Sequence, residues 1–456
     1  METRSTRRKF VWALAAVGGT AAAAAAAAMH RSILARLSLL TRLPEFSATP
    51  PLVPHDPVKD KRTLYVSQGK GPSGNVDAVV EKLGGIERLV GADDVVIIKV
   101  SAQWWNIGMT NVASVKRMIE LVVGRPGFTG EVIVFENTHF RLADGSGLSR
   151  AFTHPSVRNV DVEGWTKMGD LLGHFEKEKA PVSFVGLVDA GTSSMGGDHW
   201  HDHAHEHGVY GGDGRGPIAD GEDRDGYHWD FSRTFRKKRS WVDSAQTPLT
   251  WPRFTSPRTG VVVDLKDGLF ERKDGALHPL GRKLTFVNMT TANEHVSTGL
   301  TCACKSAMGI VDMSAGRNGT DPRVRDYQSV HYFGEPGASW RMAGPLAHFA
   351  KEVRAPDLYL ACAEYVGLVP AAGLPGEEPD LRIEEASAIR AGTVVAGTDP
   401  VAIDTWVAKN LLLPRGGKNR SRYDVDDPDS VLSRFLRYYR EVHGSGTLDP
   451  ALIDVA

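Results

Sequence analysis

The sequence has almost no net charge and very little cysteine. Its 54 lysine and arginine residues are matched by 55 aspartate and glutamate residues, so the surface as a whole carries no field that would attract nucleic acid or an anionic membrane. Only three cysteines occur in 456 residues. An odd number excludes a fully paired disulfide framework, and their spacing is not that of iron–sulfur ligands. We therefore expect no nucleic-acid partner and no iron–sulfur cluster held by this chain.

The sequence also lacks a long, strongly apolar run. The stretch from Val11 to Ala28 is uncharged but consists mainly of alanine and glycine, which contribute little transfer free energy. Arg7, Arg8 and Phe10 stand directly before it, in the layout of a twin-arginine export signal. We therefore expect the twin-arginine machinery to export the protein to the periplasm or cell envelope. A retained membrane anchor is the alternative, because the run reaches the minimum length for a spanning helix.

The remaining pattern divides the chain into four further parts. Residues 29–60 combine an arginine-containing amphipathic stretch with a proline-rich linker, which would contact a membrane only if the signal were retained. Folded α/β sequence is expected over 61–190 and 258–456. Residues 191–257 between them are polar and rich in glycine, and such a long segment is expected to be an irregular insertion.

Short β-branched runs predict the central sheet. Asp94–Val100 and Glu131–Glu136 are typical of buried strands, and the helical pattern between them begins after Asn111, a suitable N-cap. This β-α-β unit implies parallel strands. Further strands are expected at 182–189, 283–289, 357–363 and 392–397, a β-hairpin around Asp267–Gly268, and a C-terminal helix. The predicted fold class is α/β, with a mostly parallel doubly wound sheet, an irregular histidine-rich insertion and a β-hairpin.

The insertion contains five histidines on alternate positions. In an extended chain all five would project to one side, and in a helix the residues four apart would form pairs. Either arrangement presents imidazoles to Zn, Ni or Cu, so a divalent transition metal is the cofactor that fits this segment. A solvated loop that is rich in histidine is the alternative. An acidic stretch and a basic cluster follow, and the basic cluster favours a solvated face or a partner for the acids over phosphate binding. The five expected metal ligands are His199, His201, His203, His205 and His207.

Four segments resemble a known family. VVIIKV with Thr110 downstream is followed by EVIVFENTHF, EHVSTGLTCACKSAMGIVD and GTVVAGTDPVAIDTWVAKNLL. Together they resemble the family called domain of unknown function 362, over roughly Lys61 to Leu413. The last segment is the most specific, because AGTDPVAIDT follows the family's Gly-x-Asp-Pro-Val-Ala-x-Asp signature. The resemblance brings no settled reaction, but it singles out Lys99, His295, Thr301, Lys305, Gly309, Asp399 and Asp404.

Polar residues follow several predicted strands. In open parallel sheets, ligands bind outside the carboxyl ends of the strands, so these residues would line one crevice for a small anionic or carbonyl ligand. We expect the catalytic residues to be Lys99, Glu136, His295, Lys305 and Asp404. The full set of strand-end residues is Lys99, Gln103, Glu136, Asn137, His139, Asp189, Asn293, Glu294, His295, Glu364 and Asp399.

Each candidate also has a structural interpretation. Asp399 precedes Pro400, which favours an N-cap. Asp404 lies one turn into the same helix, as a catalytic group or as an ion-pair partner of Lys99 or Lys305. Lys305 fits a substrate anion, a base with a lowered pKa, or a structural ion pair. Cys302 and Cys304 fit a soft metal or redox chemistry, although buried, inert thiols are favoured.

Three functions are consistent with these patterns. The first is an exported, metal-dependent enzyme acting on a small anionic or carbonyl compound. The second is a non-catalytic periplasmic protein that binds or delivers a metal through the histidines. A redox partner protein is the third, and the lack of cluster ligands disfavours it.

Overall fold

The computed structural model describes residues 60–102, 109–137, 159–187, 216–238, 244–295, 298–312, 330, 339–367, 388–415 and 420–456. The helices are α2 (Gly71–Lys82), α3 (Ile86–Leu89), α4 (Val112–Val123), α6 (Asp170–Lys177), α8 (Ala343–Glu352), α10 (Pro400–Val407), α11 (Arg420–Tyr423) and α12 (Val431–His443). Short 3₁₀ turns occur at η3 (Ser306–Gly309), η6 (Ser339–Met342), η8 (Leu413–Arg415) and η9 (Pro450–Leu452), and a π-helical turn, η7 (Ala408–Leu412), follows α10.

The large sheet has eight strands in the order β15-β1-β14-β13-β10-β2-β3-β4. Pairing is parallel from β13 through β10, β2 and β3 to β4, and β14 runs antiparallel to both of its neighbours. This confirms the predicted α/β class with a mostly parallel sheet. The strands are β1 (Arg62–Gln68), β2 (Val95–Val100), β3 (Glu131–Asn137), β4 (Val182–Leu187), β10 (Leu284–Thr290), β13 (Leu358–Gly367), β14 (Ala388–Gly397) and β15 (Ile453–Val455).

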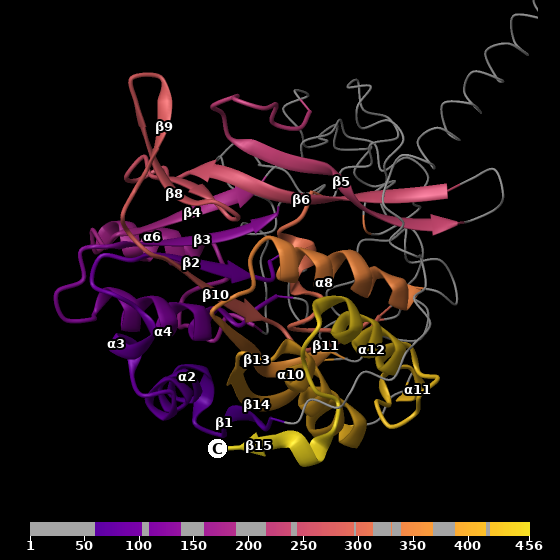
Figure 1. Cartoon of the computed structure of the whole chain (residues 1–456). Coiled ribbons are helices and arrows are strands. Elements are labelled where there is room, and N and C mark those ends of the chain that lie inside the picture. Colours follow the sequence, from indigo (N-terminus) through magenta and orange to yellow (C-terminus); the bar gives the residue numbers. More distant parts are fainter. Residues whose placement is uncertain are drawn as a thin grey trace, which may run out of the picture.

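Residue alternation on the strands builds a core on each face of this sheet. On β2, Val96, Ile98 and Val100 face one core, while Val95 and Ile97 face the other. The first core lies under α2, α4 and α6, and the second lies under α8, α10 and α12. Figure 1 shows the two groups of helices on opposite sides of the sheet. Helices cover both faces, as a doubly wound sheet requires.

The predicted β-α-β unit is confirmed in detail. Asn111 caps α4 by accepting a hydrogen bond from the Ser114 backbone N–H, and Val112, Val115, Ile119 and Val122 are fully buried. At the other end of the chain, α12 begins at the Ser430 cap and ends at Gly444 with a φ of 86°, which glycine adopts without steric cost.

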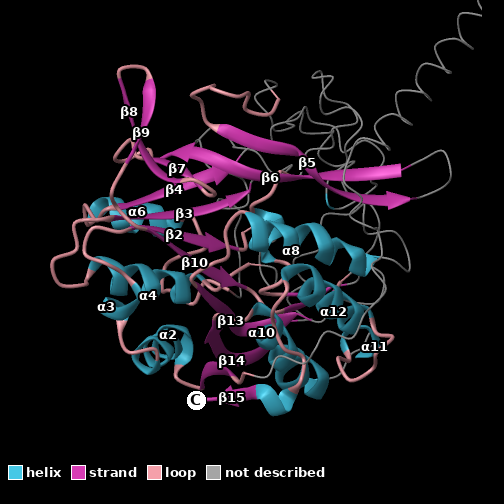
Figure 2. Cartoon of the chain, in the orientation of Figure 1, coloured by secondary structure: helices cyan, strands magenta, loops and turns pink. Residues whose placement is uncertain are grey.

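A second, five-stranded antiparallel sheet packs beside the first. It contains β5 (Gly226–Lys238), β6 (Ser244–Thr255), β7 (Val262–Asp264), β8 (Gly268–Lys273) and β9 (Ala276–Pro279). Strands β7 and β8 form the expected hairpin. Figure 2 shows β5 and β6 extending across the top of the molecule. The rings of Phe135 and Phe254 stack at 5.7 Å between centroids and thereby join the two sheets.

Strands β5 and β6 were not expected from the sequence. Residues 191–257 were predicted to be irregular, but residues 226–238 and 244–255 within them form paired strands. The missed signal is the alternation of aromatic residues, because Tyr227 and Trp229 on β5 and Trp251 on β6 are buried. The acidic stretch before β5 forms ion pairs with Arg224 and Arg272.

Candidate active site

A buried ion pair joins the carboxyl ends of two neighbouring strands. Lys99 near the end of β2 and Glu136 near the end of β3 lie with Nζ 3.2 Å from Oε2, and both side chains are at most 3% exposed. Burial lowers the pKa of Lys99 and raises the pKa of Glu136 to about 8, although each charge partly opposes the shift of the other. Burial therefore moves the pKa values of the two groups toward each other, as at many functional sites and in structural ion pairs alike.

Gly309 packs directly against this ion pair. A Cβ atom at Gly309 would lie 2.5 Å from Glu136 Oε1 and 2.7 Å from Lys99 Nζ. Only a glycine allows η3 to approach the two charged groups so closely. This explains in physical terms a position that the sequence resemblance had marked without a role.

Lys305 directly precedes η3 and lies in the same cluster. Its side chain is nine-tenths buried, and its Nζ donates to Thr301 Oγ1 at 3.4 Å. Burial, followed by the nearby charge of Lys99, lowers its pKa to about 7. Within the described ranges no carboxylate forms an ion pair with Lys305. The cluster thus contains two lysines and one carboxylate.

Asp404 forms no ion pair with Lys99 or Lys305, which was its expected structural role. It is buried in α10, where its two oxygens accept hydrogen bonds from the backbone N–H groups of Ala303 and Cys304 at 2.8 and 3.1 Å. Burial raises its pKa to about 7 against these bonds. These N–H groups lie in a tight turn and not in a β-ladder, so the carboxylate supplies the acceptor that they need. Asp404 therefore positions Lys305 by holding the turn that precedes it.

Two residues near the cluster were not predicted. Asn288 on β10 is the register partner of Lys99 on β2, and its Oδ1 accepts a hydrogen bond from Ser306 Oγ at 2.8 Å. This bond ties η3 to the sheet. The available signal was an amide within the buried strand LTFVNMT, because a buried amide needs a hydrogen-bond partner.

His295 lies in a separate hairpin beside the cluster. It ends β11 (Asn293–His295), which pairs antiparallel with β12 (Gly299–Thr301), so that Asn293 stands opposite Thr301. Its Nδ1 accepts a hydrogen bond from the Thr298 backbone N–H at 3.2 Å. The structure thus holds the ring in the hairpin that carries the Lys305 partner Thr301.

Asp399 does not belong to the predicted crevice. Because β14 is antiparallel to β13, Gly397 pairs with Tyr359 near the start of β13, and Asp399 therefore lies at the opposite edge of the sheet. There it caps α10, accepting hydrogen bonds from the N–H groups of Val401 and Ala402. The capping interpretation is confirmed.

The other predicted site residues divide into two groups. Glu364 lies near the end of β13 with its Oε1 bound to Arg390 Nε at 2.9 Å, and Asn293 Oδ1 accepts a hydrogen bond from the Gly367 N–H. Gln103, His139 and Asp189 lie outside the described residues, as do all five histidines of the expected metal site. Among the described residues, no group of three or more metal-ligating side chains occurs.

The three cysteines are buried and free. Burial, and then the charge of Asp404, raise the pKa of Cys302 and Cys304 well above the usual value. A thiol is nucleophilic and binds metals as the thiolate, so this environment favours the inert interpretation of the CAC motif.

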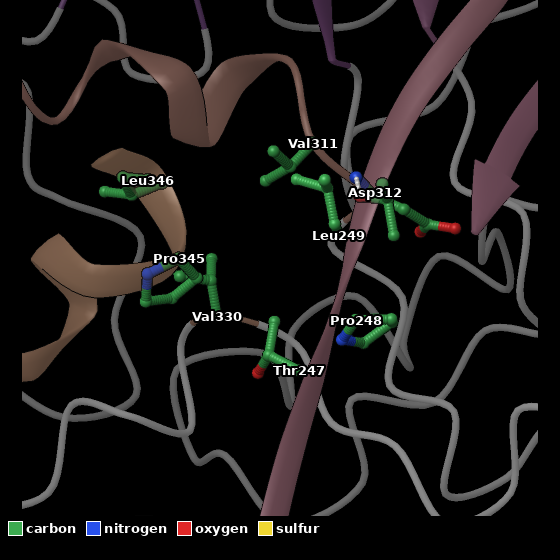
Figure 3. Close-up of a pocket in the computed structure, with 9 residues that line it drawn as sticks. Thr247, Pro248, Leu249, Val311, Asp312, Val330, Pro345 and Leu346 are labelled. Carbon is green, nitrogen blue, oxygen red and sulfur yellow. Dashed lines mark hydrogen bonds between the residues drawn. The ribbon is translucent and has the colours of Figure 1, made fainter. Parts of the chain in front are cut away.

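A small pocket opens between β6, the segment after η3 and α8. Its lining includes Leu249, Val311, Pro345 and Leu346, which Figure 3 shows converging from three elements. Its cavity volume of about 10 Å³ is near the lower limit for one water molecule. Among the described residues, the space is therefore no larger than one water molecule would fill.

The fold and this cluster define an α/β protein with a buried lysine–carboxylate site at the carboxyl edge of a mostly parallel sheet. Residues 283–409 match the family model described as "Domain of unknown function (DUF362)", and this match supports the family assignment for that segment. The matched segment contains Lys305, Gly309 and Asp404, while Lys99 and Glu136 precede it. No curated protein and no solved structure matches the chain. No described helix is long and apolar enough to cross a membrane.

Proposed function

We propose that the protein is an exported enzyme that binds a small anionic or carbonyl compound at the cluster of Lys99, Glu136 and Lys305. The supporting observation is the environment of Lys305. This amine is nine-tenths buried and lacks an acidic partner among the described residues, which is costly unless a ligand supplies one.

The charges of the cluster favour an anion. Glu136 balances Lys99, so protonation of Lys305 leaves one excess positive charge in a poorly solvated place. A carboxylate or phosphate would compensate this charge through charge-assisted hydrogen bonds. A carbonyl oxygen beside the same amines would be polarised as negative charge develops on it.

Lys305→Met is expected to weaken ligand binding strongly without unfolding the protein. A hydrogen bond to a charged group contributes about 1.5–3 kcal/mol, so affinity for a carboxylate or phosphate ligand should fall roughly 10- to 100-fold. Calorimetric titration of the parent and the variant with small carboxylates and phosphates provides the measurement. Lys273→Met, at an exposed position of β8, is the matched control and should bind as the parent does. Equal affinity of the parent and Lys305→Met for every ligand bound would refute the proposed site.

The difference in unfolding free energy between the parent and the same variant is expected to depend on pH. The pKa of Lys305 falls from 10.5 to about 7 in the folded protein, so the unfolded chain binds more protons between these pH values. The contribution of Lys305 to the free energy of unfolding therefore rises with pH over this window. Subtracting the unfolding free energy of Lys305→Met from that of the parent isolates this rise, because Glu136 and Asp404 titrate in both proteins.

A second candidate function is metal binding by the exported chain. Five histidines on alternate positions support it, since imidazole suits Zn, Ni and Cu. We expect protein purified without a tag from the native envelope fraction to contain such a metal, and a variant lacking residues 198–207 to lose most of it. Elemental analysis beside a thermal melt measures both. Recovery of the protein from the cytoplasm alone would contradict export, and an unchanged metal content would contradict this metal site.

A further inference from the structure

We propose that Lys305 acts as a nucleophile and forms a Schiff base with the carbonyl group of its substrate, an inference that rests on the proposed function. The supporting geometry is a buried amine that follows a fixed turn, lies near a second lysine and forms no ion pair with an acid among the described residues. A substrate that carries both a carbonyl and an anionic group, such as a 2-oxo acid, fits this chemistry.

The first requirement for a nucleophilic lysine is a neutral amine. Ordinary lysines are almost entirely protonated near neutral pH, whereas burial and the neighbouring charge of Lys99 bring the pKa of Lys305 to about 7. Desolvation together with an adjacent cation is a known way of activating an amine for this reaction. An ion pair with Lys305 would oppose this activation by favouring the protonated amine. Glu136 forms its ion pair with Lys99 instead.

The second requirement is a fixed position for the amine. Two hydrogen bonds from the backbone to Asp404 hold the turn before Lys305, and the Ser306–Asn288 bond holds the turn after it. The lysine backbone is therefore anchored on both sides. An anchored nucleophile gains from orientation, because less freedom is lost on reaching the attacking geometry.

The reaction balances with groups that the cluster contains. The neutral Lys305 Nζ attacks the carbonyl carbon, the C=O electron pair moves to oxygen, and a proton passes from nitrogen to that oxygen, which gives a carbinolamine. The Lys99 ammonium then protonates the hydroxyl group, the C–O bond breaks, water leaves, and the nitrogen lone pair completes the iminium bond. A proton from solvent then recharges the neutral Lys99, and the Glu136 carboxylate, 3.2 Å from Lys99 Nζ, stabilises the ammonium form.

Reductive trapping with glyoxylate tests this inference on the full-length protein. The protein is incubated with glyoxylate and borohydride near pH 7, and the modified lysines are mapped by peptide mass spectrometry. We expect Lys305 to be modified at least about tenfold faster than Lys273, because only a neutral amine adds to the aldehyde. The rate at Lys305 should level off above a pH of about 7, while the rate at Lys273 continues to rise. Labelling of Lys305 no faster than that of Lys273 would overturn the proposal.

Lys305→Arg separates this inference from the proposed function. The variant keeps the positive charge but cannot form the imine, so it should retain binding of a non-carbonyl anion such as inorganic phosphate and lose the rapid adduct. If the parent binds phosphate through Lys305 and yet forms no adduct, the Schiff base is excluded and the anion site stands. If neither binding nor adduct depends on Lys305, both proposals are wrong. Mapping the adduct on the parent chain does not depend on the variants folding.

Discussion

Lys99→Met is expected to lower the free energy of unfolding by roughly 3–5 kcal/mol, because it leaves the Glu136 carboxyl buried without its cation. The side chains of both residues are almost fully buried. Urea-induced unfolding of the parent and the variant measures the loss. Lys61→Met is the control, since the side chains of Lys61 and its partner Asp454 are 61% and 49% exposed, and such a surface pair contributes at most about 1 kcal/mol.

The loss should depend on pH in a defined direction. Burial raises the pKa of Glu136 to about 8, and Lys99 opposes that rise, so the variant moves the pKa of Glu136 still higher. A carboxyl group with a raised folded-state pKa costs stability as the pH increases from its unfolded value through its folded value. Lys99→Met should therefore be more strongly destabilised at pH 9 than at pH 6.

Adding Glu136→Gln to Lys99→Met should restore part of the stability, because an amide is cheaper to bury than a carboxylate. The four proteins form a double-mutant cycle whose coupling energy measures the pair. A double variant less stable than the sum of the two single changes would show that the two residues do not act as a pair.

Gly309→Ala is the second large effect that we expect. The new Cβ would meet Glu136 Oε1 at 2.5 Å and Lys99 Nζ at 2.7 Å, so η3 or the ion pair must shift. Overpacking of this kind typically costs about 1–3 kcal/mol. Because the shift falls on the site, ligand affinity should decrease together with stability.

Gly281→Ala is a suitable control for this change. A Cβ at Gly281 meets nothing within 4 Å, and neither glycine has a positive φ, so the two variants differ in contacts and not in backbone strain. Thermal melts and the same calorimetric titration measure both effects. Wild-type stability and binding in Gly309→Ala would contradict the close approach of η3 to the pair.

Local sequence patterns correctly predicted the elements whose physical cause lies in neighbouring residues. The β-branched run of β2, the Asn111 cap of α4 and the Asp399–Pro400 start of α10 all appear as expected, because caps and buried strands depend on neighbouring residues. The β7–β8 hairpin belongs to the same class. By contrast, β5 and β6 depend on pairing between two long strands, and the polar residues around them concealed their aromatic alternation.

The sequence by itself determined which charged residues stand beside apolar runs, namely Lys99, Glu136, Lys305 and Asp404. Their burial follows from that placement. Only the tertiary structure decided how they combine, because the partners come from different strands and helices. In the structure, Lys99 forms an ion pair with Glu136, and Asp404 accepts a hydrogen bond from the Ala303 backbone N–H. Lys305 forms no ion pair with an acid among the described residues.

Strand direction is the second property that the sequence left open. The run GTVVAG predicted a strand, but the same residues form a buried strand in either direction. The antiparallel course of β14 places Asp399 at the edge opposite Lys99, which removes it from the candidate site. The direction of a strand depends on the edge of the sheet at which the preceding chain enters it. That edge is set by long-range packing, which a local sequence pattern does not contain.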